Sequence, residues 1–193
     1  MDLTQGSINE KTARAKKMML WFGMISIAMM FAGLTSAYVV SKSRPDWLID
    51  FQIPTAFFWS TAAILLSSLL VHLSLRSSKN QESGLATLLL LGGFTLGITF
   101  IILQFMGFSQ IVADGYYFTG EESTITTSFL YAIVFSHVVH VIAGMVVLAV
   151  MLFNQYRGKY ANGQTLGFEL GAMFWHFLDF LWLYLIVFFY FFR

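Results

Sequence analysis

Five apolar runs, separated by short polar loops, dominate this sequence of 193 residues. Crossing the hydrocarbon core of a bilayer, which is about 30 Å thick, takes roughly twenty apolar residues in a helix, and every run is long enough. Only 11% of the residues are charged, whereas soluble domains contain about 25%. The sequence therefore predicts an all-α membrane protein with five transmembrane helices, forming a single integral membrane domain over residues 1–193. The expected helices cover residues 18–41, 54–75, 84–113, 123–154 and 165–192.

Basic residues are unevenly distributed outside the five runs. Eight Lys and Arg residues flank the runs on the side of the N-terminus, and three flank them on the other side. Cytoplasmic loops of membrane proteins carry the excess of Lys and Arg. We therefore expect the N-terminus inside and the C-terminus outside, as five crossings require. The eight residues are Lys11, Arg14, Lys16, Lys17, Arg76, Lys79, Arg157 and Lys159.

Several classes of site are excluded by composition. The sequence contains no cysteine, so disulfides, thiolate metal sites and cysteine nucleophiles are absent. It also lacks the glycine-rich fingerprints of nucleotide-binding folds. About seventeen polar residues precede the first run, which is not typical of a cleavable signal peptide.

Small residues at four-residue spacing predict faces where helices approach closely. The pairs are Gly33/Ala37, Gly93/Gly97 and Gly167/Gly171.

Polar side chains within the runs are the candidate functional residues, because an ionisable group in a bilayer normally faces protein or a water-filled cavity. A structural network, a proton pathway and a metal or haem site are three possible roles. Two histidines three residues apart fall short of the three or four convergent ligands of zinc, so the structural role is favoured. We predict a buried cluster between the last helices, formed by Gln104, His137, His140, Glu169, His176 and Asp179.

The run at 165–192 contains the most specific motif. Its segment GFELGAMFWHFLDFLWL resembles the last helix of subunit III of the haem–copper terminal oxidases, in which a Glu is followed by W-H-F-x-D and W-L. The corresponding residues here are Glu169, Trp175, His176, Phe177, Asp179, Trp182 and Leu183.

The preceding runs resemble the same family. SHVVHVIAG is similar to its H-x-x-H-V-x-x-G pattern, with His137, His140 and Gly144, and ILQ ending at Gln104 resembles its L-Q element. The likeness extends from about residue 18 to the C-terminus. It implies the five-helix form, which lacks the first two helices of seven-helix members and in which Gly144 is a further packing position. Many members carry a buried glutamate in the helix that corresponds to 18–41, but this run contains no acid, so we assign no proton site to it.

The resemblance implies a subunit without redox centres, with no catalytic or metal-binding residue. Haem and copper then belong to partner subunits, and structural phospholipids occupy a cleft between the first two helices and the last three. Subunit I is the expected main contact, with subunit II and other respiratory-complex subunits as further partners, and no nucleic acid. The expected function is support of proton uptake and stability in a proton-translocating cytochrome c oxidase during aerobic electron transport, in a bacterial cytoplasmic membrane.

Other functions stay open on the sequence alone. Within the resemblance, the alternatives are subunit III of a bo-type quinol oxidase and a nitric-oxide-reductase accessory protein. Outside it, a proton-coupled transporter would use Glu169 and Asp179 as a relay, yet the sequence contains no internal repeat of the kind that transporters carry. A membrane-bound metal enzyme is the remaining alternative.

Overall fold

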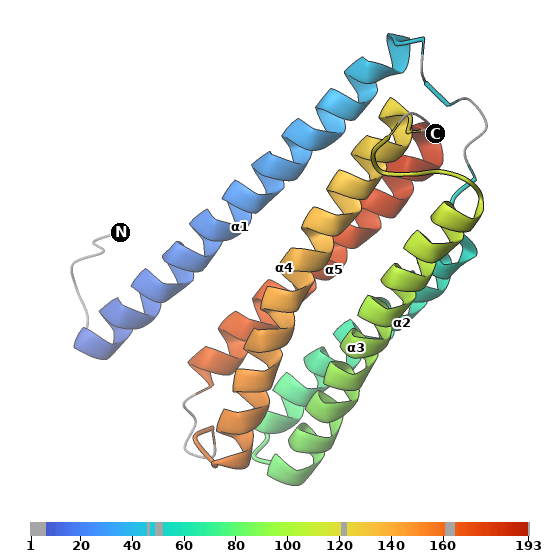
Figure 1. The fold of residues 1–193 in the computed structure, drawn as a ribbon. Coiled ribbons are helices and arrows are strands. Elements are labelled where there is room, and N and C mark those ends of the chain that lie inside the picture. The colour runs from blue at the N-terminus through green and yellow to red at the C-terminus, as the bar shows by residue number, and fades with distance from the viewer. Residues whose placement is uncertain (1–6, 46, 49–51, 121–122, 161–164, 193) are drawn as a thin grey trace.

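A computed structural model describes residues 7–45, 47–48, 52–120, 123–160 and 165–192. The described residues form five long helices and one short 3-10 helix, and they include no strand. Figure 1 shows the long helices side by side, with the first leaning away from the other four. The elements are α1 (Ile8–Val40), η1 (Ser41–Ser43), α2 (Thr55–Lys79), α3 (Ser83–Ala113), α4 (Ile125–Tyr156) and α5 (Leu166–Phe192).

All five long helices are long and apolar enough to cross a membrane, which confirms the predicted fold class. A helix satisfies its own backbone hydrogen bonds, so it is one of the two structures that can span hydrocarbon. The 31 residues of α3 and 32 residues of α4 rise by about 45–50 Å at 1.5 Å per residue. These helices therefore exceed the hydrocarbon thickness of about 30 Å and must tilt or project beyond it.

The first helix begins earlier than its apolar run. Ser7 is the N-cap of α1, and its hydroxyl accepts a hydrogen bond from the backbone N–H of Glu10, whose side chain accepts one from the N–H of Ser7. This capping box satisfies two N-terminal amides. As a result α1 starts at Ile8, ten residues before the run that begins at residue 18, and its first turns are polar.

The helices do not pair as the resemblance implied. Helix α2 packs along α3 and also contacts α5, whereas α1 contacts α4, α5 and η1 but, within the described residues, neither α2 nor α3. A cleft between the first two helices and the last three is therefore wrong in position, because α2 belongs to the same bundle as the last three (Figure 1). Helix α5 is the centre of the bundle, with α1, α2 and α4 around it.

Candidate functional site

Glu169, which lies in the first turn of α5, joins three helices at one end of the bundle. Its carboxylate lies 2.8 Å from Nζ of Lys79 on α2 and 3.7 Å from Nζ of Lys17 on α1. Thr165 donates a further hydrogen bond to it at 3.4 Å. The Glu169 side chain is 28% exposed, so the expectation that it belongs to a buried cluster is wrong. Glu169 forms an ionic link between helices at one end of the bundle. We call this end, which carries Lys17 and Lys79, the basic end.

About two and three turns further along α5, His176 and Asp179 face α2. Nδ1 of His176 hydrogen-bonds with Oγ of Ser68 at 2.6 Å, and its ring lies 5.9 Å, centroid to centroid, from the ring of His72. Asp179 is only 3% exposed and lies beside Ser68. Sequence reasoning missed Ser68 and His72, which both lie in the apolar run at residues 54–75.

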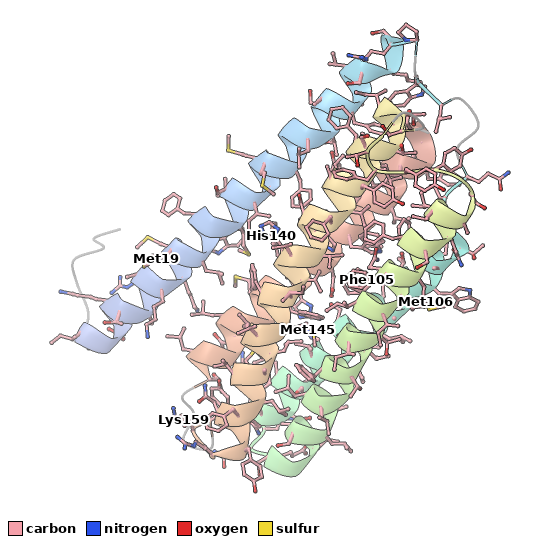
Figure 2. All side chains as sticks on the ribbon, viewed as in Figure 1. Met19, Phe105, Met106, His140, Met145 and Lys159 are labelled. Carbon is pink, nitrogen blue, oxygen red and sulfur yellow. The ribbon has the colours of Figure 1, made fainter. Side chains whose placement is uncertain are left out.

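The histidines of α4 occupy a separate place, among aromatic rings. His137 is fully buried and lies nearly parallel to Trp182, with ring centroids 5.3 Å apart. Phe31 of α1 meets both His137 and His140 edge to face, and Nδ1 of His140 donates to the backbone oxygen of Ser136 on its own helix. Figure 2 shows His140 on the side of α4 that faces α1.

These positions divide the predicted cluster into two groups. His176 hydrogen-bonds with Ser68 of α2 and Asp179 is buried beside the same serine, whereas His137 and His140 pack against aromatic rings of α1, α3 and α5. Within the described residues, no hydrogen bond or ring contact joins the two groups. The sequence identified which residues are polar within the spans, but a helical periodicity does not specify which neighbour each of them meets.

A row of serines on α2, which sequence reasoning missed, connects this helix to α3. Ser60, Ser67 and Ser74 are seven residues apart and fully buried. Their spacing of seven residues, two turns of helix, is the signal that could have found them. Ser60 accepts a hydrogen bond from the side chain of Gln104 at 2.9 Å, while Ser67 and Ser74 donate to the backbone oxygens of Gly93 and Ala86.

Two tryptophans of the α5 motif extend this contact to the central helix. Nε1 of Trp175 donates to Oγ of Ser67 at 3.2 Å, and Nε1 of Trp182 donates to Oγ1 of Thr61 at 2.9 Å. Both tryptophans are almost fully buried. The other motif residues, Phe177 and Leu183, are half-buried.

Glycines lie where side chains of other helices come closest. A Cβ atom at Gly93 would meet Val71, one at Gly97 would meet Met145 and Trp175, and one at Gly144 would meet Leu178 and Trp175. At Gly171 it would overlap Met151, and at Gly167 it would be in ordinary contact with Tyr160. The Cβ position of Gly33, in contrast, is in open space within the described structure, and Gly33 is exposed. The Gly33/Ala37 face therefore makes no close helix contact within the described part of the chain.

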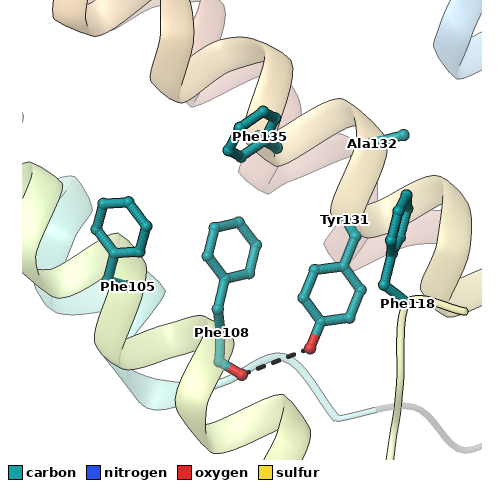
Figure 3. Close-up of a pocket in the computed structure, with 6 residues that line it drawn as sticks. All are labelled: Phe105, Phe108, Phe118, Tyr131, Ala132 and Phe135. Carbon is teal, nitrogen blue, oxygen red and sulfur yellow. Dashed lines mark hydrogen bonds between the residues drawn. The ribbon is translucent and has the colours of Figure 1, made fainter.

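An apolar pocket of about 340 Å³ opens between α3 and α4, near the end opposite the basic end. The ring of Tyr131 stacks on that of Phe108, with centroids 5.2 Å apart, and the Tyr131 hydroxyl donates to the backbone oxygen of Phe108 (Figure 3). With this hydroxyl turned to the backbone, the wall offers no polar group to a ligand and suits a hydrocarbon chain. Its lining residues are Phe105, Phe108, Phe118, Tyr131, Ala132 and Phe135.

The arrangement is suited to holding helices together. Among the described residues, no three His, Cys, Asp or Glu side chains are grouped as metal ligands. The polar groups of α5 meet serine, threonine, histidine and lysine side chains of the neighbouring helices.

Comparison with known proteins agrees with the motif on α5. The family described as cytochrome c oxidase subunit III matches residues 4–193. The chain belongs to this family. It is 28% identical to the cytochrome bo(3) ubiquinol oxidase subunit 3 of Pseudomonas aeruginosa, over 84% of this chain and 78% of that protein. It is 24% identical to the corresponding subunit of Buchnera aphidicola, over 93% and 88%. Identity to the cytochrome c oxidase subunit 3 of Tetraodon nigroviridis is 32%, over 72% of this chain and 50% of that protein.

The subunit III family thus includes relatives of two lengths. The chain spans about half of the cytochrome c oxidase subunit 3 of Tetraodon nigroviridis but most of the two bo(3) subunits. It is an integral membrane protein and a subunit III of the haem–copper oxidases, which are complexes of several subunits.

Proposed function

We propose that this subunit III is a non-catalytic scaffold of a respiratory oxidase, packing against subunit I and supporting proton uptake and the stability of the catalytic core. The observation that carries the proposal is that several polar side chains inside the spans form hydrogen bonds with other helices of the same chain. Gln104 is bonded to Ser60, Trp175 to Ser67 and His176 to Ser68. Such interhelical bonds hold helices in fixed positions relative to one another. The bundle therefore presents a rigid surface to a partner subunit.

Structural phospholipid is the second part of the proposal. The pocket between α3 and α4 has an apolar lining and a volume of about 340 Å³, and the acyl chain of a phospholipid fits that chemistry. Orientation follows from the uneven distribution of Lys and Arg: the basic end faces the cytoplasm and the C-terminus the outside. The membrane is then the bacterial cytoplasmic membrane, in keeping with the bacterial relatives over most of the chain.

Two electron donors are compatible with the family, cytochrome c and quinol. The cytochrome c oxidase is favoured by 32% identity to a subunit of that name. The quinol oxidase is favoured by coverage, since 78% and 88% of the two bo(3) subunits are matched. The donor is selected by another subunit of the complex.

Purification of the chain in mild detergent, followed by mass spectrometry of the chains that migrate with it, tests the proposal. We expect a large haem-binding membrane subunit in fixed stoichiometry. Turnover of the purified complex with reduced cytochrome c and, separately, with ubiquinol then identifies the donor. An isolated oligomer of this chain that carries out transport, or metal bound to the chain alone, would contradict the proposal.

A further inference from the structure

A polar patch on α2 and α5 is not explained by packing within the chain. It consists of Ser68, His72, His176 and Asp179, and we call it the histidine patch. Ser68 hydrogen-bonds with His176, and Asp179 is buried beside Ser68. His72 is exposed, and its ring contacts His176 at a centroid distance of 5.9 Å. Nε2 of His176 is buried, with no hydrogen-bond partner among the described residues.

His72 lies near the inner end of the apolar run of α2, three residues before the run ends at residue 75. Lys79, whose ammonium group pairs with Glu169 at the basic end, follows His72 by seven residues, or about 10 Å of helix. The exposed neighbours of His72 on α2 include Leu65, Leu69 and Leu73, which suit an apolar surrounding. An imidazole exposed among them would lose its hydrogen bonds to water without replacement, and such polar groups normally face protein or a water-filled cavity.

The charges near the patch indicate what covers it. Arg76 lies one turn beyond His72 on α2, and Lys79 and Lys17 follow at the basic end, where Glu169 is the acid that pairs with both lysines. This part of the surface therefore has an excess of positive charge. A lipid phosphate that pairs with this charge stays at the membrane surface, and the nearest charge, Arg76, is separated from His72 by about 6 Å of helix. A helix that spans the membrane reaches both levels.

We propose that the histidine patch is the docking surface for a transmembrane helix of another oxidase subunit, which presents a hydrogen-bond acceptor to His72 and an acidic residue near Arg76. This inference rests on the proposed function and adds to it the face of the chain and the chemistry of the contact. Leu65, Leu69 and Leu73 supply the apolar part of the interface, and the imidazole of His72 fixes its register.

Photo-crosslinking in native membranes tests the contact. A benzophenone amino acid replaces His72 in one variant and Leu88 in a control. Leu88 is exposed on α3 at the same depth, because the bonds from Ser74 to Ala86 and from Ser67 to Gly93 set the register of the two helices. We expect the label at position 72 to form a covalent adduct with a second oxidase subunit, and the label at position 88 to react with lipid.

Each other outcome has a distinct meaning. Adducts with lipid alone at position 72, or with a second copy of this chain, overturn the docking surface while the oxidase subunits still copurify and the proposed function stands. If no oxidase subunit copurifies with the unsubstituted chain, the proposed function fails, and the docking surface fails with it.

Substitution of His72 provides a second measurement. His72→Leu should leave the helix content unchanged, because His72 is exposed, but should increase dissociation of the chain from the complex in detergent by about 3- to 20-fold, the range of one interhelical hydrogen bond. His72→Gln, which keeps a donor, should recover part of this loss. Equal retention of the His72→Leu and unsubstituted chains would overturn the proposal.

Discussion

Ser67 is the residue at which three helices meet. Its hydroxyl donates to the backbone oxygen of Gly93 on α3 at 2.7 Å and accepts from Nε1 of Trp175 on α5 at 3.2 Å. Serine can instead bond to the backbone of its own helix, as Ser109 does with Phe105. The sequence alone therefore does not tell a serine that joins helices from one that does not, which is why Ser67 was missed.

Ser67→Ala should destabilise the chain, because it leaves the buried N–H of Trp175 without an acceptor. We expect a loss of about 1–2 kcal/mol, which is in the range for an unsatisfied buried group and for an interhelical bond in a membrane. Ser109→Ala is the matched control, since that hydroxyl is exposed and bonded within its own turn, and it should change stability by less than about 0.5 kcal/mol. Reversible unfolding in mixed micelles measures both, and equal stability of the two variants would contradict the role of Ser67.

In the candidate site, too, the sequence predicted which residues matter but not which partners they contact. The W-H-F-x-D motif identified Trp175, His176 and Asp179 because this residue order is specific to the family. Glu169 was expected in the same buried cluster, since it precedes His176 by seven residues. The structure instead places it at the end of α5, where two lysines reach it. Lysine side chains are long enough to reach a neighbouring helix from near a helix end. Because the two lysines belong to α1 and α2, the spacing of residues within α5 could not predict this contact.

At the scale of the elements, the helices themselves were predictable. A run of about twenty apolar residues has few alternatives to a spanning helix, because the backbone must be satisfied internally. Which helices pack against each other was less predictable. The three residues between α2 and α3 make these helices antiparallel neighbours, and buried serines and glycines draw them together. Sequence spacing identified the glycines of α3, whereas the family resemblance grouped α2 with α1 on one side of a cleft.

Gly107→Ala tests whether α2 and α3 pack closely. A Cβ atom at this position would overlap the ring of Phe57, which is 1% exposed. Overpacking of this kind costs about 1–3 kcal/mol. Gly33→Ala, on the exposed side of α1, places its methyl group in open space, and replacing glycine by alanine within a helix is favourable by about 0.5–1 kcal/mol. The two variants should therefore shift the thermal transition in opposite directions, and a shift in the same direction would count against the packing described.

For the whole molecule, bound lipid is tested at the pocket between α3 and α4. Ala132→Leu places a larger side chain in this pocket. It should displace two or three methylene groups of an acyl chain, each worth about 0.8 kcal/mol, and weaken lipid binding about tenfold or more. Native mass spectrometry counts the phospholipids that remain on the complex. Ala143→Leu, on an exposed part of α4, is the control and should retain the full number. An unchanged lipid count in Ala132→Leu would show that the pocket holds no lipid.

Assembly with the other oxidase subunits is the property in which a scaffold differs from a catalyst. Asp179 is 97% buried, on the helix at the centre of the bundle and next to Ser68 of α2. Asp179→Ala leaves a void at this contact and loosens the surface that α2 and α5 present together. We therefore expect a loss of this chain from the purified complex, while turnover per haem in the complexes that retain it stays within about twofold of the unsubstituted enzyme. Val146→Ala, at an exposed position of α4, should alter neither quantity. Normal stoichiometry together with lost turnover would contradict a role in assembly and would instead place Asp179 in the chemistry.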